Sequence, residues 1–109
     1  MKSNIKNLQD FRRSEKNIER HLTEEVKKAG GLCLKFSSMT ETGYPDRVLL
    51  FPGGLLAFVE LKSTGKKPTK LQEIRHGQLR EMGFPVYVID HLDRVADMLT
   101  QLAEYYNAI

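Results

Sequence analysis

Two apolar segments joined by a short glycine turn constrain the fold of this chain more than any other feature. The first runs from Arg47 to Phe51 and the second from Leu55 to Lys62, with Pro52-Gly53-Gly54 between them. Both segments are rich in the branched and aromatic residues that favour strands, and the glycines favour a tight turn. The sequence therefore predicts a β hairpin whose three-residue loop sets Phe51 opposite Leu55.

The parity of this hairpin brings charged residues to one side of it. Counting back from the turn sets Asp46 opposite Glu60, and Glu60 and Lys62 share a face through the two-residue period of a strand. Val59 and Leu61 then point to the other face, where we expect the core. A loop of two or four residues would break this parity, and a bulge in the turn would shift the register.

A structural ion pair between Glu60 and Lys62 is one explanation of these charges. It does not account for Asp46, because two carboxylates a few ångströms apart repel each other unless a cation lies between them. Mg²⁺ is commonly held by one or two carboxylates together with water and phosphate oxygens. A lysine beside such a site can orient or deprotonate a water molecule and stabilise developing phosphorane charge.

The remaining chain predicts one small domain in which helices pack against the sheet. Residues 1–13 are polar and are expected to form an arm or a frayed extension, and residues 14–109 form the domain. Besides the hairpin, the expected elements are a helix from Ser14 to Gly30, a strand from Leu32 to Phe36, a helix capped by Thr69 and ending near Met82, a strand from Pro85 to Ile89, and a helix from Leu92 to about Tyr105. The order α-β-β-β-α-β-α indicates an α/β or α+β fold. Cys33, Met82 and Met98 are expected in the core.

Composition excludes several classes of protein. With 40% hydrophobic and 28% charged residues in 109, the chain has the balance of an ordinary globular domain. No apolar run approaches the roughly 20 residues that a membrane span needs. The N-terminus is too polar for a secretory signal, and the single Cys33 cannot form an internal disulfide. We therefore expect a protein of the reducing cytoplasm.

Basic residues gather after the hairpin. The net charge of +3 permits a polyanionic partner without requiring one. Six basic side chains fall within one short stretch: Lys62, Lys66, Lys67, Lys70, Arg75 and Arg80. For charge alone, a solvated surface is the more common explanation.

The motifs around the hairpin resemble a known nuclease family. Pro45-Asp46, followed by Glu60-Leu61-Lys62, resembles the signature of the PD-(D/E)XK nucleases. The surrounding residues are similar to the VRR-NUC branch of that superfamily, over roughly residues 15 to 91. They are Gly43-Tyr44-Pro45-Asp46-Arg47, Pro52-Gly53-Gly54, Phe58-Val59-Glu60-Leu61-Lys62, Gly65-Lys66-Lys67-Pro68, Leu71-Gln72 and Gly83-Phe84-Pro85-Val86-Tyr87-Val88-Ile89-Asp90.

The resemblance implies a fold and a site. The fold would be a restriction-endonuclease-like core with a central mixed sheet flanked by helices. Asp46 and Glu60 match metal-binding carboxylates, the carbonyl of Leu61 a further metal ligand, Lys62 the catalytic lysine, and Gln72 a glutamine that completes the site. The family also uses a first-helix glutamate. Glu15 and Glu19 lie one turn apart on one helix face, and we favour Glu15 slightly, as a metal ligand.

The resemblance also implies a DNA endonuclease that uses Mg²⁺ or Mn²⁺. Candidate DNA contacts are Lys35, Lys66, Lys67, Lys70 and His76, although a solvated surface position is the more common explanation of a histidine such as His76. With no base-reading element in the sequence, specificity would come from DNA shape, and a branched substrate such as a Holliday junction fits best.

Cutting two strands of a junction requires two active sites, so a homodimer is expected. Its interface could use the apolar face of the last helix, which carries Leu92, Val95, Met98, Leu99 and Leu102. Alternatively, this face covers the sheet of its own subunit. Two other functions stay open: a DNA-binding module without catalysis, and a nuclease subunit that cuts only with a partner protein.

Overall fold

The structure is a computed structural model that describes residues 5–107. Its elements follow the predicted order, preceded by one helix that was not predicted. In chain order they are α1 (Ile5–Arg13), α2 (Glu15–Lys28), β1 (Leu32–Lys35), β2 (Arg47–Phe51), β3 (Leu55–Leu61), α3 (Lys70–Glu81), β4 (Val86–Ile89) and α4 (Arg94–Asn107). Within residues 5–107, every helix is too short or too polar to span a lipid bilayer.

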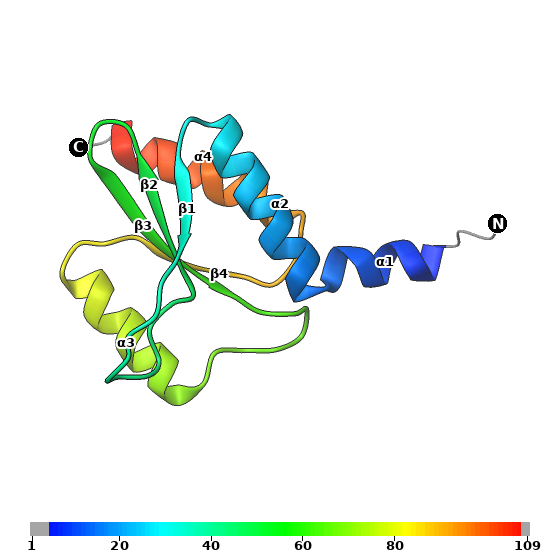
Figure 1. Cartoon of the computed structure of the whole chain (residues 1–109), viewed down its shortest axis with the longest axis horizontal. Coiled ribbons are helices and arrows are strands. Elements are labelled where there is room, and N and C mark those ends of the chain that lie inside the picture. Colours follow the sequence, from blue (N-terminus) through cyan, green and yellow to red (C-terminus); the bar gives the residue numbers. More distant parts are fainter. Residues whose placement is uncertain (1–4, 108–109) are drawn as a thin grey trace.

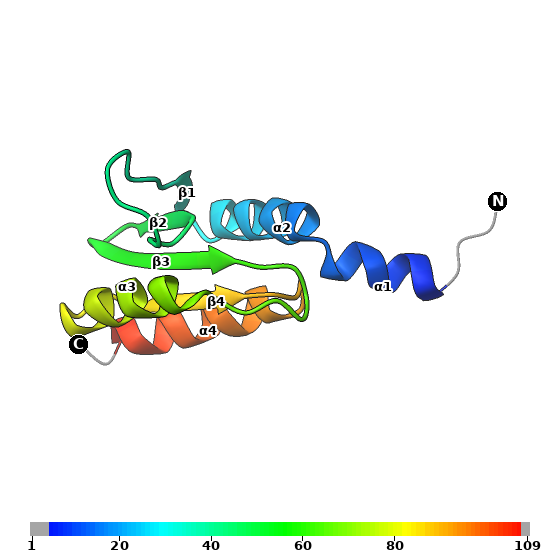
Figure 2. The ribbon, with the colours of Figure 1, turned by 90° about the horizontal axis from the view of Figure 1, so that it is seen from below.

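The four strands form one mixed sheet in the order β1-β2-β3-β4. Figure 2 shows them as successive rows from β1 to β4. The first three strands are antiparallel neighbours, and β4 pairs with β3 in parallel. The predicted hairpin register is confirmed, since Phe51 lies opposite Leu55. The turn needs its glycines because Gly53 and Gly54 have φ angles of 91° and 83°, where L side chains are strained.

One face of the sheet carries the core. Side chains of β2 and β3, among them Leu49 and Val59, point toward α2 and α4, which lie together in the upper part of Figure 1. From the helices, Ile18, Leu22, Val26, Val95, Met98 and Leu102 are buried against them. The expected burial of Val59 and Leu61 is confirmed, with 0% and 2% of their surface exposed.

The apolar face of α4 therefore belongs to its own subunit. Val95, Met98 and Leu102 are at most 2% exposed, and Leu92 and Leu99 are partly buried against the same core. Their burial leaves little apolar surface for a second copy of the chain. The expectation that this face forms a dimer interface is wrong, and the alternative that it covers its own sheet is confirmed.

The other face of the sheet is covered by α3, which lies alone at the lower left of Figure 1. A capping box starts this helix: the Thr69 hydroxyl accepts a hydrogen bond from the Gln72 amide, and the Gln72 side chain accepts one from the Thr69 amide. The Arg80 guanidinium donates to the carbonyl of Val86 at 2.9 Å and so ties α3 to β4. The cap thus sets where α3 begins, and Arg80 ties its last turn to β4.

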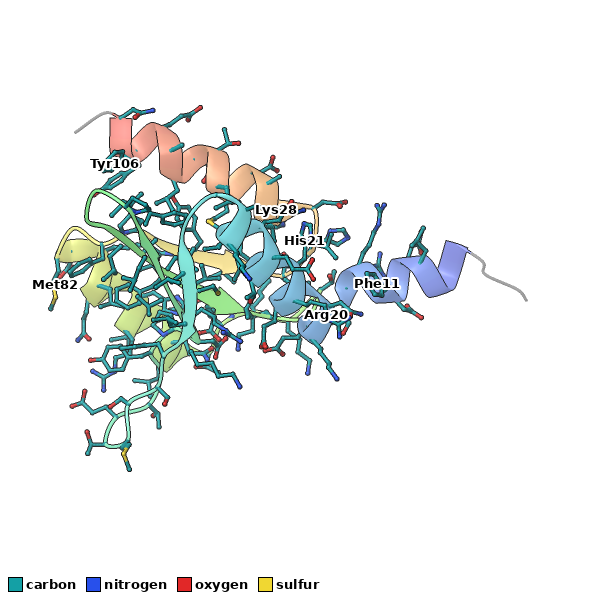
Figure 3. The ribbon with its side chains drawn as sticks, turned by 45° about the horizontal axis from the view of Figure 1, so that its top comes forward. Phe11, Arg20, His21, Lys28, Met82 and Tyr106 are labelled. Atoms are coloured by element: carbon teal, nitrogen blue, oxygen red, sulfur yellow. The ribbon has the colours of Figure 1, made fainter. Side chains whose placement is uncertain are left out.

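The periphery adds a helix to the expected N-terminal arm and exposes Met82. Ile5–Arg13 form the helix α1, which projects from the rest of the molecule in Figures 1 and 2. The described part of the expected polar arm is therefore helical, and residues 1–4 lie outside the described residues. Met82 was expected in the core but is 71% exposed at the end of α3 and points away from the sheet in Figure 3. Met98 is buried as expected, and the half-buried Cys33 packs against the core.

Candidate active site

The hairpin brings Asp46 to the end of β3. Arg47 lies opposite Val59, so Asp46 and Glu60 are the next residues along the same register. The Asp46 side chain accepts a hydrogen bond from the backbone amide of Leu61 at 2.9 Å. Its own carbonyl accepts one from the amide of Phe36, at 2.8 Å, just after β1. These two bonds fix Asp46 between the ends of β1 and β3.

Glu60 is a buried carboxylate surrounded by polar side chains from β3 and α3. Only 1% of its surface is exposed. Oε2 accepts a hydrogen bond from Gln72 Nε2 at 3.2 Å and lies 3.6 Å from Lys62 Nζ. Oε1 lies 3.7 Å from His76 Nε2, and neither of these two atoms has a hydrogen-bond partner among the described residues. The structure therefore brings Glu60, Lys62 and Gln72 together, as the sequence predicted, and adds His76.

Burial and charge raise the pKa of Glu60 from 4.5 to about 7. Burial is the largest cause, the negative charge of Asp46 adds to it, and Lys62 acts in the opposite direction. A buried carboxylate beside a second carboxylate is costly to ionise without a further positive charge. The pair can therefore accept a cation, which would favour the ionised form of both groups.

The two glutamates of α2 that were proposed for the site, Glu15 and Glu19, lie beside Asp46 rather than beside Glu60. Glu15 and Glu19 line a pocket together with Asp46 and Leu61; its other lining residues are Lys35, Phe36, Ser37 and Arg47. Within residues 5–107, no three side chains of His, Cys, Asp or Glu form a group that could hold a metal ion. Glu15 and Glu19 thus share a pocket with Asp46, but among the described residues neither completes a three-carboxylate cluster.

An ion pair distinguishes the two glutamates. Glu19 Oε1 lies 2.7 Å from Arg47 Nη2, and Arg47 is only 8% exposed. The same guanidinium donates to the carbonyl of Cys33 at 3.5 Å and so links α2 to the sheet. None of the ion pairs found among residues 5–107 includes Glu15, which is exposed. Glu19 therefore already has a structural partner, while Glu15 is available to a ligand.

The predicted DNA contacts divide into exposed lysines and one buried histidine. Lys66, Lys67 and Lys70 are exposed between β3 and the first turn of α3, and the exposed Lys35 lines the Asp46 pocket. His76 is 1% exposed, which leaves no surface for a DNA contact. Both the expected DNA contact and the alternative of a solvated surface position are therefore wrong for His76.

Two contacts of the site were not predicted from the sequence. Arg47 is paired with Glu19, and His76, which was predicted only as a possible DNA contact, faces Glu60. The spacing of His76, one helical turn after Gln72, was a signal that the two share a helix face. The polar character of α3 gave no indication that this face is buried against the sheet.

No family model matches the chain. A protein of Acyrthosiphon pisum secondary endosymbiont phage 1, named "Putative nuclease p44", is 44% identical over 79 residues, which are 72% of this chain and 85% of that protein. A solved structure described as a VRR_NUC domain superimposes with a TM-score of 0.75 at 29% identity, covering 79% of this chain and 94% of the other.

The mixed sheet with its flanking helices, together with these similarities, defines a nuclease of the PD-(D/E)XK type. Within that class, the chain belongs to the VRR-NUC family. The resemblance noted from the sequence motifs is thereby confirmed for the family and for the fold.

Proposed function

We propose that this protein is a metal-dependent endonuclease that hydrolyses phosphodiester bonds in branched DNA, such as Holliday junctions. The observation that carries the proposal is the juxtaposition of Asp46 with the buried Glu60, whose pKa is raised to about 7. Two carboxylates in such surroundings, with a lysine 3.6 Å from one of them, suit a divalent cation and a phosphate better than a structural ion pair.

The chemistry of the donor set supports Mg²⁺ or Mn²⁺. Asp46 and Glu60 would supply carboxylate oxygens, and the carbonyl of Leu61 a further oxygen. Hard cations prefer oxygen ligands, and Mg²⁺ typically keeps several waters, so two carboxylates suffice as protein anchors. Of the two glutamates of α2, we assign Glu15 to the metal because Glu19 is paired with Arg47 at 2.7 Å.

A bound cation would supply an activated water and neutralise charge on the phosphate. The side chains of this chain do the positioning. Gln72 holds one oxygen of Glu60 and leaves the carboxylate with a fixed orientation. Lys62 lies beside the same oxygen, where its ammonium group can assist the attacking water and stabilise negative charge that develops on the phosphate. The products would carry 5′-phosphates.

Exposed lysines on either side of the carboxylates would hold the DNA backbone. Lys66, Lys67 and Lys70 follow β3, and Lys35 lines the same pocket as Asp46. Contacts from lysines to phosphates position DNA without reading its sequence. Selection would then depend on DNA shape, which a branched junction supplies.

Symmetrical cutting of a junction needs two active sites, and we therefore propose a homodimer. Its interface would lie outside the apolar face of α4, which is buried in its own subunit. The enzyme would act in the cytoplasm of a bacterial host, because the relative named as a putative nuclease comes from a phage of a bacterial endosymbiont.

Cleavage assays on defined DNA structures test the proposal. The purified protein is incubated with four-way, flap, splayed and linear DNA, with and without Mg²⁺ or Mn²⁺. We expect metal-dependent cleavage that is strongest on the four-way junction and is abolished by Asp46→Ala and Lys62→Ala. Lys28→Ala is the matched control, because Lys28 lies on α2 with 76% of its side chain exposed.

Three results would separate the alternatives. Binding of DNA without cleavage of any substrate would indicate a module without catalysis. Cleavage that appears only after a partner protein is added would indicate a dependent subunit. Wild-type cleavage by Asp46→Ala or Lys62→Ala would show that the site is assigned wrongly.

A further inference from the structure

His76 is a buried polar residue to which the proposed chemistry gives no task. It lies on α3, one turn after Gln72, and is 1% exposed. Its Nε2 atom lies 3.7 Å from Oε1 of Glu60, which is equally buried. A polar group in such a position needs a partner or a reason to lack one.

Both facing atoms lack a hydrogen bond. Among the described residues, Glu60 Oε1 and His76 Nε2 are the buried side-chain atoms without a partner. Their separation of 3.7 Å exceeds the range of about 2.7–3.2 Å for an N–H···O bond by roughly half an ångström. Each unsatisfied buried polar group destabilises the folded state, and a leucine would fill similar space without that penalty. Packing alone therefore does not account for an imidazole at this position.

The two oxygens of Glu60 face two side chains of the same helix. Gln72 donates to Oε2 at 3.2 Å, and His76 faces Oε1. Residues four apart lie on one face of a helix, so α3 approaches both oxygens of the carboxylate at once. Only the Gln72 contact is formed in this structure.

We propose that His76 is a positioning residue for Glu60, whose Nε2–H donates a hydrogen bond to Oε1 when the carboxylate is engaged with a divalent cation. Carboxylates that hold metals are commonly held themselves by surrounding donors, which fix their orientation. Gln72 and His76 would together hold both oxygens of Glu60. This inference rests on the proposed role of Glu60 in metal binding.

An imidazole can supply the donor that Glu60 Oε1 lacks. A neutral ring with its proton on Nε2 donates one hydrogen bond to a carboxylate without adding positive charge beside a cation. His76 Nε2 lacks a partner among the described residues and lies 3.7 Å from Oε1, so it is placed for this role.

Mn²⁺ affinity measured without DNA tests the inference. Mn²⁺ is titrated by calorimetry into the wild type, His76→Leu and His76→Gln. His21→Leu is the matched control, because it makes the same chemical change at a half-buried histidine of α2. We expect His76→Leu to bind Mn²⁺ about 10- to 100-fold more weakly, as is usual when a donor to a metal ligand is lost. His76→Gln, which keeps an N–H donor, should restore most of the affinity.

Cleavage rates at two metal concentrations give a second readout. His76→Leu should be slow at limiting Mn²⁺ and recover at saturating Mn²⁺, because the variant weakens binding rather than chemistry. Wild-type affinity in His76→Leu, or the same loss in His76→Gln as in His76→Leu, would overturn the inference. If His76→Leu does not fold, nitrogen NMR of the wild-type His76 ring in Mg²⁺ decides: an unprotonated Nε2 rejects the inference, and a protonated Nε2 supports it.

Asp46→Asn separates this inference from the proposed function. If the wild type binds no Mn²⁺, both fall. If the wild type binds Mn²⁺, Asp46→Asn weakens the binding and His76→Leu does not, then only the role of His76 is wrong.

Discussion

The raised pKa of Glu60 makes the stability of the metal-free protein depend on pH. The folded state holds the Glu60 proton more tightly than the unfolded chain, because the carboxyl group is buried beside Asp46. Its pKa rises from 4.5 to about 7, so the stabilisation is fully present below pH 4.5 and is lost as the pH rises through 7. The shift corresponds to about 3 kcal/mol. Solvent screens this carboxylate little, since Glu60 is only 1% exposed.

Glu60→Gln isolates this contribution, because the amide has nearly the shape of the carboxyl group and does not titrate. Urea unfolding of the wild type and the variant is measured at pH 4 and at pH 8.5, with a chelator present to keep the protein free of metal. As the pH rises from 4 to 8.5, the free energy of unfolding of Glu60→Gln should increase by about 3 kcal/mol relative to that of the wild type, because only the wild type loses the Glu60 contribution. Glu24→Gln, at an exposed position of α2, should show no comparable change.

Addition of Mg²⁺ extends the same experiment. At pH 8.5 it should stabilise the wild type, because a cation bound to the folded state shifts the unfolding equilibrium, and should stabilise Glu60→Gln much less. If the free energies of unfolding of the wild type and Glu60→Gln differ by the same amount at pH 4 and at pH 8.5, the reasoning is refuted. Glu60 would then not be a proton-binding group in buried surroundings.

Three further predictions concern residues around the site and the fold. Glu15→Gln should weaken Mn²⁺ binding and leave the free energy of unfolding unchanged. Glu19→Gln should lower the free energy of unfolding by about 1 kcal/mol; the effect is small because the Glu19 side chain is 42% exposed. The reverse pattern would assign the metal to Glu19. Gly53→Ala should destabilise the hairpin by about 1–3 kcal/mol, because Gly53 has a φ angle of 91°. An added methyl group would also collide with the hydroxyl of Tyr106, which lies beside the turn in Figure 3. Gly77→Ala, inside α3 with open space at its Cβ position, should instead stabilise the protein by about 1 kcal/mol, and equal effects at the two glycines would contradict this account. Thr69→Ala removes the hydroxyl half of the capping box and should cost about 1 kcal/mol, whereas unchanged stability would show that the cap contributes nothing.

The hairpin register could be predicted from the sequence because local chemistry determines it. A three-residue turn with two glycines fixes which residues face each other, and the two-residue period extends that parity to Asp46 and Glu60. The order of the later elements followed from similarly local signals, such as the Thr69 cap and Gly83 after α3.

The rest depended on packing between distant segments. His76 resembles a surface histidine in sequence, and its burial follows from the docking of α3 beneath β3. The pairing of Glu19 with Arg47 joins α2 to β2, so helical spacing alone could not separate Glu15 from Glu19. The apolar face of α4 was compatible with two partners until its burial against α2 and the sheet was known.

A crystal structure of the wild type soaked in Mn²⁺ tests the central claim most directly. Anomalous scattering locates manganese independently of the protein atoms. We predict an anomalous peak between the carboxylates of Asp46 and Glu60, near the carbonyl of Leu61, and no such peak in Asp46→Asn. Manganese bound only elsewhere, or the same peak in Asp46→Asn, would contradict the account.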